Sequence, residues 1–293
     1  METASERLTL KDGRRVAVHY PARGGAGSTV VLCHAAPGSG GFDPDPAATD
    51  SRGVTLIGVD RPGYGGSDPV PDPEWSSVAL AAGDLAEVLD QLGTGPVGVA
   101  GWSAGGRVAL ALAARRPDLV ERVAVLATPA PDEVVGWIPP EQRAGLAALR
   151  GLPAGQVHQA LREQLAAAVP ADPGQALALL GNGDADAAAL DRPGARDRLA
   201  AMLGAAFAQG VTGLAADIAG YCLQPWGFEP AGVAAKTLLL YGAADPVAGP
   251  PHGKWYQRQL PDARYEQVPA AGHLLVLPAW RRVLSHLAPQ HRG

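Results

Sequence analysis

The chain has 293 residues, of which 47% are hydrophobic, and a formal net charge of −5. This length accommodates one large domain, alone or with an inserted subdomain. The negative charge and the absence of long Lys or Arg runs argue against nucleic acid or an anionic membrane as a partner. Two cysteines do not suggest a disulfide framework. The first seven residues lack the apolar core of a signal peptide, and no stretch approaches the ~20 apolar residues of a membrane span, so we expect a cytoplasmic protein.

Apolar runs and their spacing predict strands and helices in a regular order. The expected strands are residues 7–10, 15–20, 29–33, 54–59, 96–100, 120–126, 236–241 and 265–268. The expected helices are 75–92, 107–116, 254–260 and 274–287. The first two strands flank Asp12-Gly13, a hairpin turn, and the later strands alternate with helices. The order predicts a mostly parallel eight-stranded α/β sheet with helices on both faces.

Residues 132–229 interrupt this alternation. The segment is rich in Ala, Leu and Gln and contains no run typical of a strand. We interpret it as a helical cap inserted between a first core part, residues 1–131, and a second core part, residues 230–293. Both of its ends attach at the carboxyl edge of the sheet, where ligands bind in open parallel sheets. The alternative is a helical excursion that only covers the sheet.

The segment Gly101-Trp102-Ser103-Ala104-Gly105 has the form of a nucleophile elbow, because it joins a predicted strand to a predicted helix. The sharp turn projects the Ser103 hydroxyl from the sheet edge. Side chains at positions 101 and 105 would collide with neighbouring backbone, which explains the two glycines. The alternative is a glycine-rich turn with an incidental serine.

A serine nucleophile needs a base and an acid that orients the base. Asp245 follows strand 236–241 and His273 follows strand 265–268, so the chain order is Ser, Asp, His. Asp245 could instead be a turn residue that caps the next helix. His273 could instead be a structural residue at a helix N-terminus. Asp132, after strand 120–126, is an alternative source of the carboxylate.

Four further motifs make the chain resemble the α/β-hydrolase fold superfamily, in particular its capped branch similar to epoxide hydrolases and proline iminopeptidases. They are Cys33-His34-Ala35-Ala36-Pro37-Gly38-Ser39, Asp60-Arg61-Pro62-Gly63-Tyr64-Gly65-Gly66-Ser67, Gly242-Ala243-Ala244-Asp245 and Gly272-His273. The resemblance implies an oxyanion hole made by the backbone amides of Ala36 and Ala104. Ala35 replaces the family's glycine, which leaves the exact loop donor open. Ser103 stands where epoxide hydrolases have Asp, which disfavours their chemistry.

Four bulky or polar residues near the predicted site are candidates for substrate binding: His34, Trp102, Trp137 and Trp226. Each also has a structural interpretation, as a loop histidine or as an aromatic packed against the core. No His, Cys, Asp and Glu cluster has metal-ligand spacing, so we expect neither a metal nor a cofactor.

The sequence therefore predicts a serine hydrolase acting on a small to medium, largely apolar ester, thioester, lactone or amide through an acyl-enzyme on Ser103. A cofactor-free lyase or cyclase on the same scaffold is an alternative. A proline-type aminopeptidase is another, because it needs acids in the cap to hold a free amine. Those available are Glu133, Glu141, Glu163, Asp184 and Asp186. We expect a small-molecule substrate and a monomer or homodimer.

Overall fold

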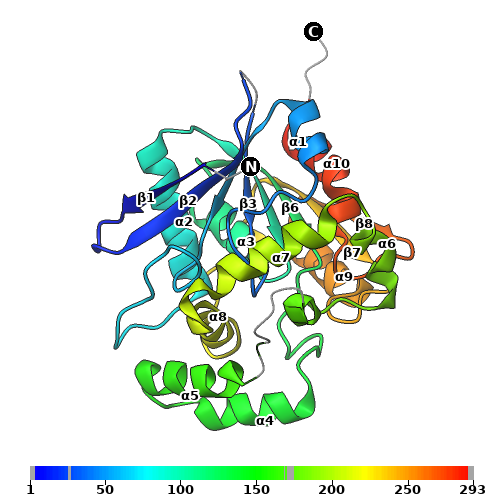
Figure 1. Ribbon diagram of the computed structural model, residues 1–293. Coiled ribbons are helices and arrows are strands. Elements are labelled where there is room, and N and C mark those ends of the chain that lie inside the picture. Colours follow the sequence, from blue (N-terminus) through cyan, green and yellow to red (C-terminus); the bar gives the residue numbers. More distant parts are fainter. Residues whose placement is uncertain (1–3, 26–27, 168, 170–174, 290–293) are drawn as a thin grey trace.

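One twisted sheet runs through the molecule (Figure 1). The computed structural model describes residues 4–25, 28–167, 169 and 175–289. Within them, eight strands pair in the order β1-β2-β4-β3-β5-β6-β7-β8. The strands are β1 (Ala4–Thr9), β2 (Arg15–Ala22), β3 (Thr29–Cys33), β4 (Thr55–Val59), β5 (Val97–Trp102), β6 (Val120–Leu126), β7 (Lys236–Gly242) and β8 (Ala263–Val268). The β1–β2 and β2–β4 pairs are antiparallel and the other pairs are parallel. This confirms the predicted fold class.

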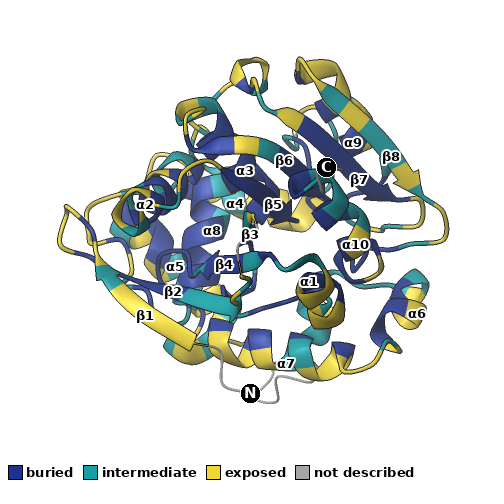
Figure 2. Ribbon diagram, turned by 90° about the horizontal axis from the view of Figure 1, so that it is seen from above, coloured by how far each residue is buried: buried dark blue, intermediate teal, exposed yellow. Residues whose placement is uncertain are grey.

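Helices cover both faces of the sheet (Figure 2). Those outside the segment between β6 and β7 are α1 (Pro46–Arg52), α2 (Val78–Leu92), α3 (Gly105–Arg115), α9 (Pro250–Gln259) and α10 (Val276–Leu287). Helices α1 and α10 lie on one face, and α2, α3 and α9 on the other. Every residue of β5 is buried, since helices cover this central strand on both sides. Edge strand β1 is mostly exposed.

Helix α1 lies in a segment where the sequence analysis predicts no element. The Asp45 side chain accepts a hydrogen bond from the amide of Ala48 at 3.1 Å, and Pro46 occupies the first turn. Gly53, with a φ of 60°, ends the helix. Only Ala48 and Thr49 are buried, so seven residues offer too little apolar periodicity to predict a helix.

The chain between β6 and β7, which we call the helical insertion, contains no strand among its described residues. Its α-helices are α4 (Pro140–Leu149), α5 (Ala154–Ala166), α6 (Ala187–Leu190), α7 (Ala195–Ala206) and α8 (Thr212–Cys222). Figure 1 shows α4, α5 and α8 below the sheet. Among the described helices none is by itself long and apolar enough to span a membrane, although Ala195–Gln209 and Thr212–Cys222, bent by 89°, pass that test as a pair.

Candidate active site

Ser103 lies at the sharp turn between β5 and α3. Its φ is +53°, a left-handed backbone conformation that residues other than glycine rarely adopt. The turn is fixed on both sides of the residue. The Ser103 amide donates to the carbonyl of Leu126 at 2.8 Å, and the Thr128 hydroxyl donates to the Ser103 carbonyl at 2.8 Å. The strained residue is therefore held between the ends of β5 and β6.

The glycines on either side of this turn are required by close backbone approach. A Cβ atom on Gly101 would overlap the backbone of Gly106, and one on Gly105 would overlap the carbonyl oxygen of Cys33. Because neither glycine has a side chain, α3 can begin directly against the ends of β3 and β5. The N-terminus of α3, with its partial positive charge, therefore lies beside Ser103.

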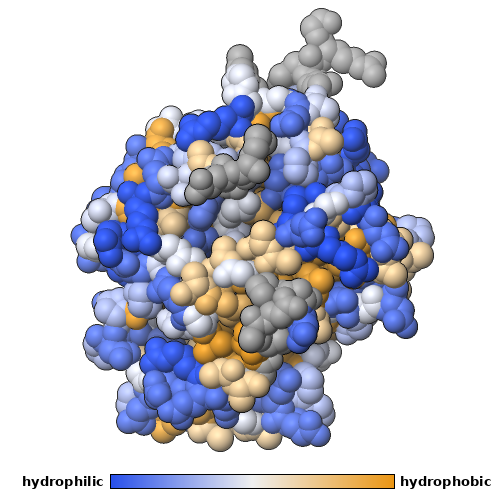
Figure 3. Space-filling view, in the orientation of Figure 1, coloured by the Kyte–Doolittle hydropathy of each residue, from blue (hydrophilic) through white to orange (hydrophobic). Residues whose placement is uncertain are grey.

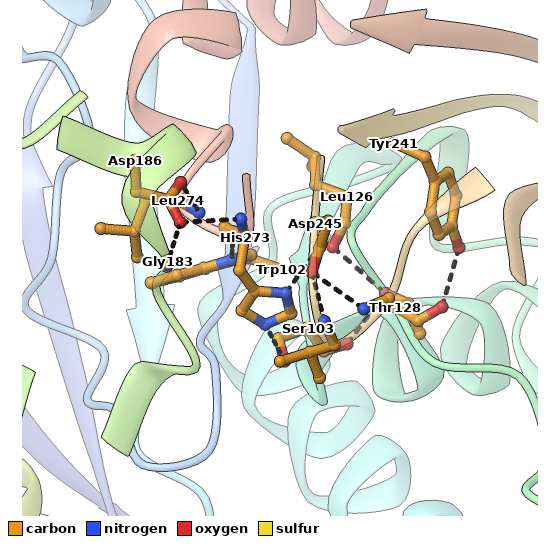
Figure 4. A network of polar contacts seen from close by, with 12 residues as sticks. Trp102, Ser103, Leu126, Thr128, Gly183, Asp186, Tyr241, Asp245, His273 and Leu274 are labelled. Atoms are coloured by element: carbon orange, nitrogen blue, oxygen red, sulfur yellow. Dashed lines mark hydrogen bonds and ion pairs between the residues drawn. The ribbon is translucent and has the colours of Figure 1, made fainter. Parts of the chain in front are cut away.

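The structure brings Ser103, His273 and Asp245 into one hydrogen-bonded line (Figure 4). His273 Nε2 is 2.9 Å from Ser103 Oγ, and His273 Nδ1 is 2.9 Å from Asp245 Oδ2. Asp245 Oδ1 accepts from the amides of Val247 and Ala248 at 2.8 and 2.9 Å. Burial would raise the pKa of Asp245, but its hydrogen bonds from His273 and the two amides outweigh burial and lower the pKa below 3.8. Asp245 is therefore a carboxylate at neutral pH.

Two residues outside this line hold the loop that carries His273. Asp186, in the helical insertion, accepts from the amides of His273 and Leu274 at 3.1 and 2.8 Å. Trp102 Nε1 donates to the carbonyl of His273 at 2.9 Å (Figure 4). Sequence reasoning did not assign Asp186 this position, because the contact joins residues 87 apart in the chain.

The loop after β3 approaches Ser103 from the other side. Among the described residues, neither the amide of Ala36 nor that of Ala104 donates a hydrogen bond to a protein acceptor. Both residues line the cavity beside Ser103. Arg61 holds this loop by donating to the carbonyls of His34 and Ala35 at 2.6 and 2.8 Å. Ala35 in this loop is buried.

Arg61 in turn connects this loop to the helical insertion. Its guanidinium bonds the carboxylate of Asp217 on α8, the shortest distance being 2.6 Å. Tyr64 donates to the same carboxylate at 2.8 Å. The insertion is therefore fastened to both loops that flank Ser103, through Asp217 on one side and Asp186 on the other.

A cavity of about 250 Å³ opens beside Ser103 and His273. Its wall is mostly apolar and combines core residues with residues of the helical insertion, among them Leu179, Leu180, Leu214 and Ile218. Hydrophobic surface gathers on this side of the molecule, between α7 and α4 (Figure 3). Within the described chain, no group of three or more His, Cys, Asp and Glu side chains is placed to hold a metal ion.

Comparison with known proteins agrees with this geometry. The model of a family described as alpha/beta hydrolase fold matches residues 28–279. The chain is also 30% identical over 253 residues to a pimeloyl-[acyl-carrier protein] methyl ester esterase of Chromobacterium violaceum, which covers 85% of this chain and 88% of that protein. The chain belongs to the α/β-hydrolase fold family. It is a hydrolytic enzyme of that family, whose members include esterases.

Other relatives match over part of the chain or in fold. A 2-hydroxy-6-oxononadienedioate/2-hydroxy-6-oxononatrienedioate hydrolase of Burkholderia vietnamiensis is 36% identical over 121 residues, 40% of this chain and 42% of that protein. An esterase from Thermogutta terrifontis superposes with a TM-score of 0.69 at 22% identity, over 97% of this chain and 95% of that one. The enol-lactonase of Burkholderia xenovorans superposes with a TM-score of 0.66 at 22% identity, over 95% of this chain and 98% of that one. The two structures show the fold.

Of the four predicted substrate-binding residues in this α/β-hydrolase, two line the cavities and two do not. Trp137 lines the cavity beside Ser103, and Trp226 lines an adjoining one. Trp102 is fully buried beneath the histidine loop and packs against Phe42. His34 is also buried; its Nε2 accepts from the amide of Arg61 at 3.2 Å. Burial and the charge of Arg61 hold the pKa of His34 well below 6.5, so its ring is neutral.

The acids that an aminopeptidase would use do not line the cavity beside Ser103. Asp186 is buried and bonded to backbone amides, as described above. The other four predicted candidates are exposed: Glu133, Glu141, Glu163 and Asp184. Asp132, the alternative partner for the histidine, instead accepts from Arg143 and from the amides of Trp137 and Ile138. Among the described residues, the five predicted acids are therefore not placed to hold a free amine in the cavity beside Ser103.

Proposed function

We propose that this α/β-hydrolase is a serine hydrolase that cleaves a small to medium, largely apolar carboxylic ester through an acyl-enzyme on Ser103. The observation that carries the proposal is the continuous line from Ser103 Oγ through His273 to Asp245, with both links at 2.9 Å. Thioesters, lactones and amides share the carbonyl chemistry. A relative named as a methyl ester esterase supports esters first.

The mechanism follows from these positions. His273 Nε2 takes the proton of Ser103 Oγ while Oγ bonds to the substrate carbonyl carbon. The negative charge on the carbonyl oxygen is stabilised by the amides of Ala36 and Ala104 beside the N-terminus of α3. His273 then gives the proton to the leaving oxygen as its bond to carbon breaks. Water, activated by the same imidazole, releases the acid and restores the Ser103 hydroxyl.

Asp245 has two tasks in this mechanism. Its bond to Nδ1 holds the imidazole in the tautomer whose Nε2 accepts the serine proton. Its lowered pKa keeps it ionised while the imidazole becomes positively charged, which stabilises the imidazolium.

We also propose that the helical insertion acts as a cap over the substrate. This is supported by the insertion residues Leu179, Leu180, Leu214 and Ile218, which form part of the wall of the cavity beside Ser103. An apolar wall favours an apolar acyl or alcohol group, because its transfer from water into the cavity is favourable.

The role of Asp245 is tested with p-nitrophenyl esters of linear acids, using the Asp245→Asn and Asp132→Asn variants. Asp245→Asn should lower kcat by about 10⁴-fold with the fold preserved. Asp132→Asn is the matched control, because Asp132 makes no bond to His273 in the described structure, and it should keep the wild-type order of magnitude. Normal turnover by Asp245→Asn, together with loss in Asp132→Asn, would reassign the acid.

A further inference from the structure

Arg107, on the first turn of α3, is a buried cation without an acidic partner. Its side chain is 2% exposed, and its Nε and Nη2 donate to the carbonyl of Pro129 at 3.3 and 3.0 Å. Among the described residues, no carboxylate forms an ion pair with it. Because removing a cation from water is costly unless its charge is compensated, this guanidinium needs an explanation.

Three aromatic rings surround Arg107. The guanidinium carbon is 4.7 Å from the ring centroid of Trp226, 5.0 Å from that of Tyr221 and 5.5 Å from that of Trp137. The faces of such rings attract cations and so hold the guanidinium in place. The rings carry no formal negative charge, however, so they leave the positive charge of Arg107 uncompensated.

The nearby acids do not compensate Arg107 either. Each carboxylate that lines the cavity beside Ser103, or the adjoining cavity of about 540 Å³, already has another arginine partner. The pairs are Asp132 with Arg143 at 2.7 Å, Glu133 with Arg150 at 3.8 Å and Asp217 with Arg61 at 2.6 Å. The charge left over at the junction of the two cavities is therefore that of Arg107.

Two unused hydrogen-bond donors lie at the same junction. Trp137 Nε1 and the Tyr221 hydroxyl are buried and have no hydrogen-bond partner among the described residues. Together with Arg107, these side chains line both cavities. Burial raises the pKa of Tyr221 well above 10, so its hydroxyl remains protonated and can donate at any working pH. A buried donor without an acceptor is unfavourable unless a ligand supplies one.

We propose that Arg107, Trp137 and Tyr221 form a subsite that binds a carboxylate of the substrate, so that the preferred substrates are esters whose acyl chain ends in a carboxylate. A carboxylate only accepts hydrogen bonds, and it matches both the charge of Arg107 and the three groups of donors. The cavity beside Ser103 includes all three residues, so one apolar chain spans from the nucleophile to the subsite. This inference rests on the proposed function, and it adds one acidic end to a substrate that is otherwise apolar.

The first test compares anionic and neutral substrates of equal length. The mono-p-nitrophenyl esters of adipate and suberate are measured against p-nitrophenyl hexanoate and octanoate. We expect kcat/KM to be at least about tenfold higher for the anionic ester at one or both lengths, the effect of a hydrogen bond to a charged group. Tyr221→Phe and Trp137→Phe each remove an unpartnered donor, and each should lower this anionic-to-neutral ratio by about tenfold.

Tyr256→Phe is the matched control. Its hydroxyl donates to the same Pro129 carbonyl as Arg107, but Tyr256 does not line either cavity. This variant should therefore keep the wild-type ratio. A preference for the neutral ester at both lengths, or a ratio that Tyr221→Phe and Trp137→Phe leave unchanged, would overturn the subsite.

A binding measurement separates this inference from the proposed function. Calorimetric titration of Ser103→Ala protein with adipate and suberate needs no turnover. We expect at least one to bind, and affinity to fall about tenfold when Tyr221→Phe is added. Binding of a dicarboxylate to Ser103→Ala, together with no hydrolysis of any tested ester by the wild-type enzyme, would contradict the serine mechanism alone. Ester hydrolysis with no binding of either dicarboxylate would contradict the subsite alone.

Discussion

Asp186, from the helical insertion, holds the backbone amide of His273 at 3.1 Å, so the insertion positions the residue that faces Ser103. The same carboxylate bonds the amides of Leu274 and Gly183, and its residue is 1% exposed. The insertion therefore supports the histidine loop as well as forming one wall of the cavity.

Replacing Asp186 by Asn should lower kcat more than it changes KM. The amide offers one oxygen to three backbone donors and turns its NH₂ group toward some of them, so the histidine loop should shift. A displacement of about 1 Å near the reacting atoms can cost 10²-fold in rate, and we expect a loss of 10- to 100-fold. Steady-state kinetics with a p-nitrophenyl ester measure it.

Asp184→Asn is the control for this variant, because Asp184 is an exposed acid in the same short helical turn. It should behave as wild type. If Asp186→Asn raises KM while leaving kcat intact, Asp186 shapes the binding of substrate and does not position His273.

The close approach at Gly105 predicts a contrast between two Gly→Ala variants. Gly105→Ala places a methyl group against the backbone carbonyl oxygen of Cys33. It should abolish activity and destabilise the fold, because a backbone atom cannot move aside as the end of a flexible side chain can. Gly83, inside α2, has no atom within 4 Å of its hypothetical Cβ. Gly83→Ala should therefore stabilise by about 0.5–1 kcal/mol, since alanine is the better helix former. Urea unfolding of both variants decides the contrast, and equal effects would contradict the packing at the elbow.

His252 predicts a pH dependence of stability. It is 4% exposed on α9, and its Nδ1 accepts from the amide of Ala130 at 3.0 Å, where the chain leaves the sheet for the insertion. Burial lowers the pKa of His252 to about 4. The folded state favours the neutral ring of His252, and this adds to the free energy of unfolding. The added stability is complete above pH 6.5 and is lost as the pH falls from 6.5 to 4, a total loss of about 3 kcal/mol.

The measurement is the free energy of unfolding between pH 8 and 4.5 for wild type and His252→Gln. Glutamine offers an uncharged acceptor, so the variant should lose less stability over the acidic part of this range. Parallel curves for the two proteins would show that protonation of His252 does not contribute.

The sheet and the hydrogen-bonded line were predictable from the sequence because their signals are local. Each of these features can be recognised from a few neighbouring residues: the apolar runs of the strands, the glycines around Ser103, and the loops after β7 and β8. Parallel strands present their carboxyl ends at one edge, so Ser103, Asp245 and His273 are brought together by topology alone.

What the sequence did not reveal depends on contacts distant in the chain and on side-chain direction. Asp186 and Asp217 reach loops 87 and 156 residues away, and no local pattern marks those pairings. The sequence left Trp102 open between lining the pocket and packing under the sheet. Successive side chains at a strand end point in opposite directions, and Trp102 is buried beneath the sheet edge. Arg107 carried one usable signal, a charge at the start of an otherwise apolar buried helix.

Covalent trapping of the nucleophile tests the central claim most directly. The folded enzyme is incubated with a fluorophosphonate, and the modified peptide is located by mass spectrometry. We expect one adduct on Ser103, absent in Ser103→Ala and formed far more slowly in His273→Ala. A folded enzyme that turns over substrate but gives no adduct, or gives one on another residue, would contradict the acyl-enzyme mechanism and favour a lyase or cyclase that uses His273 as a base.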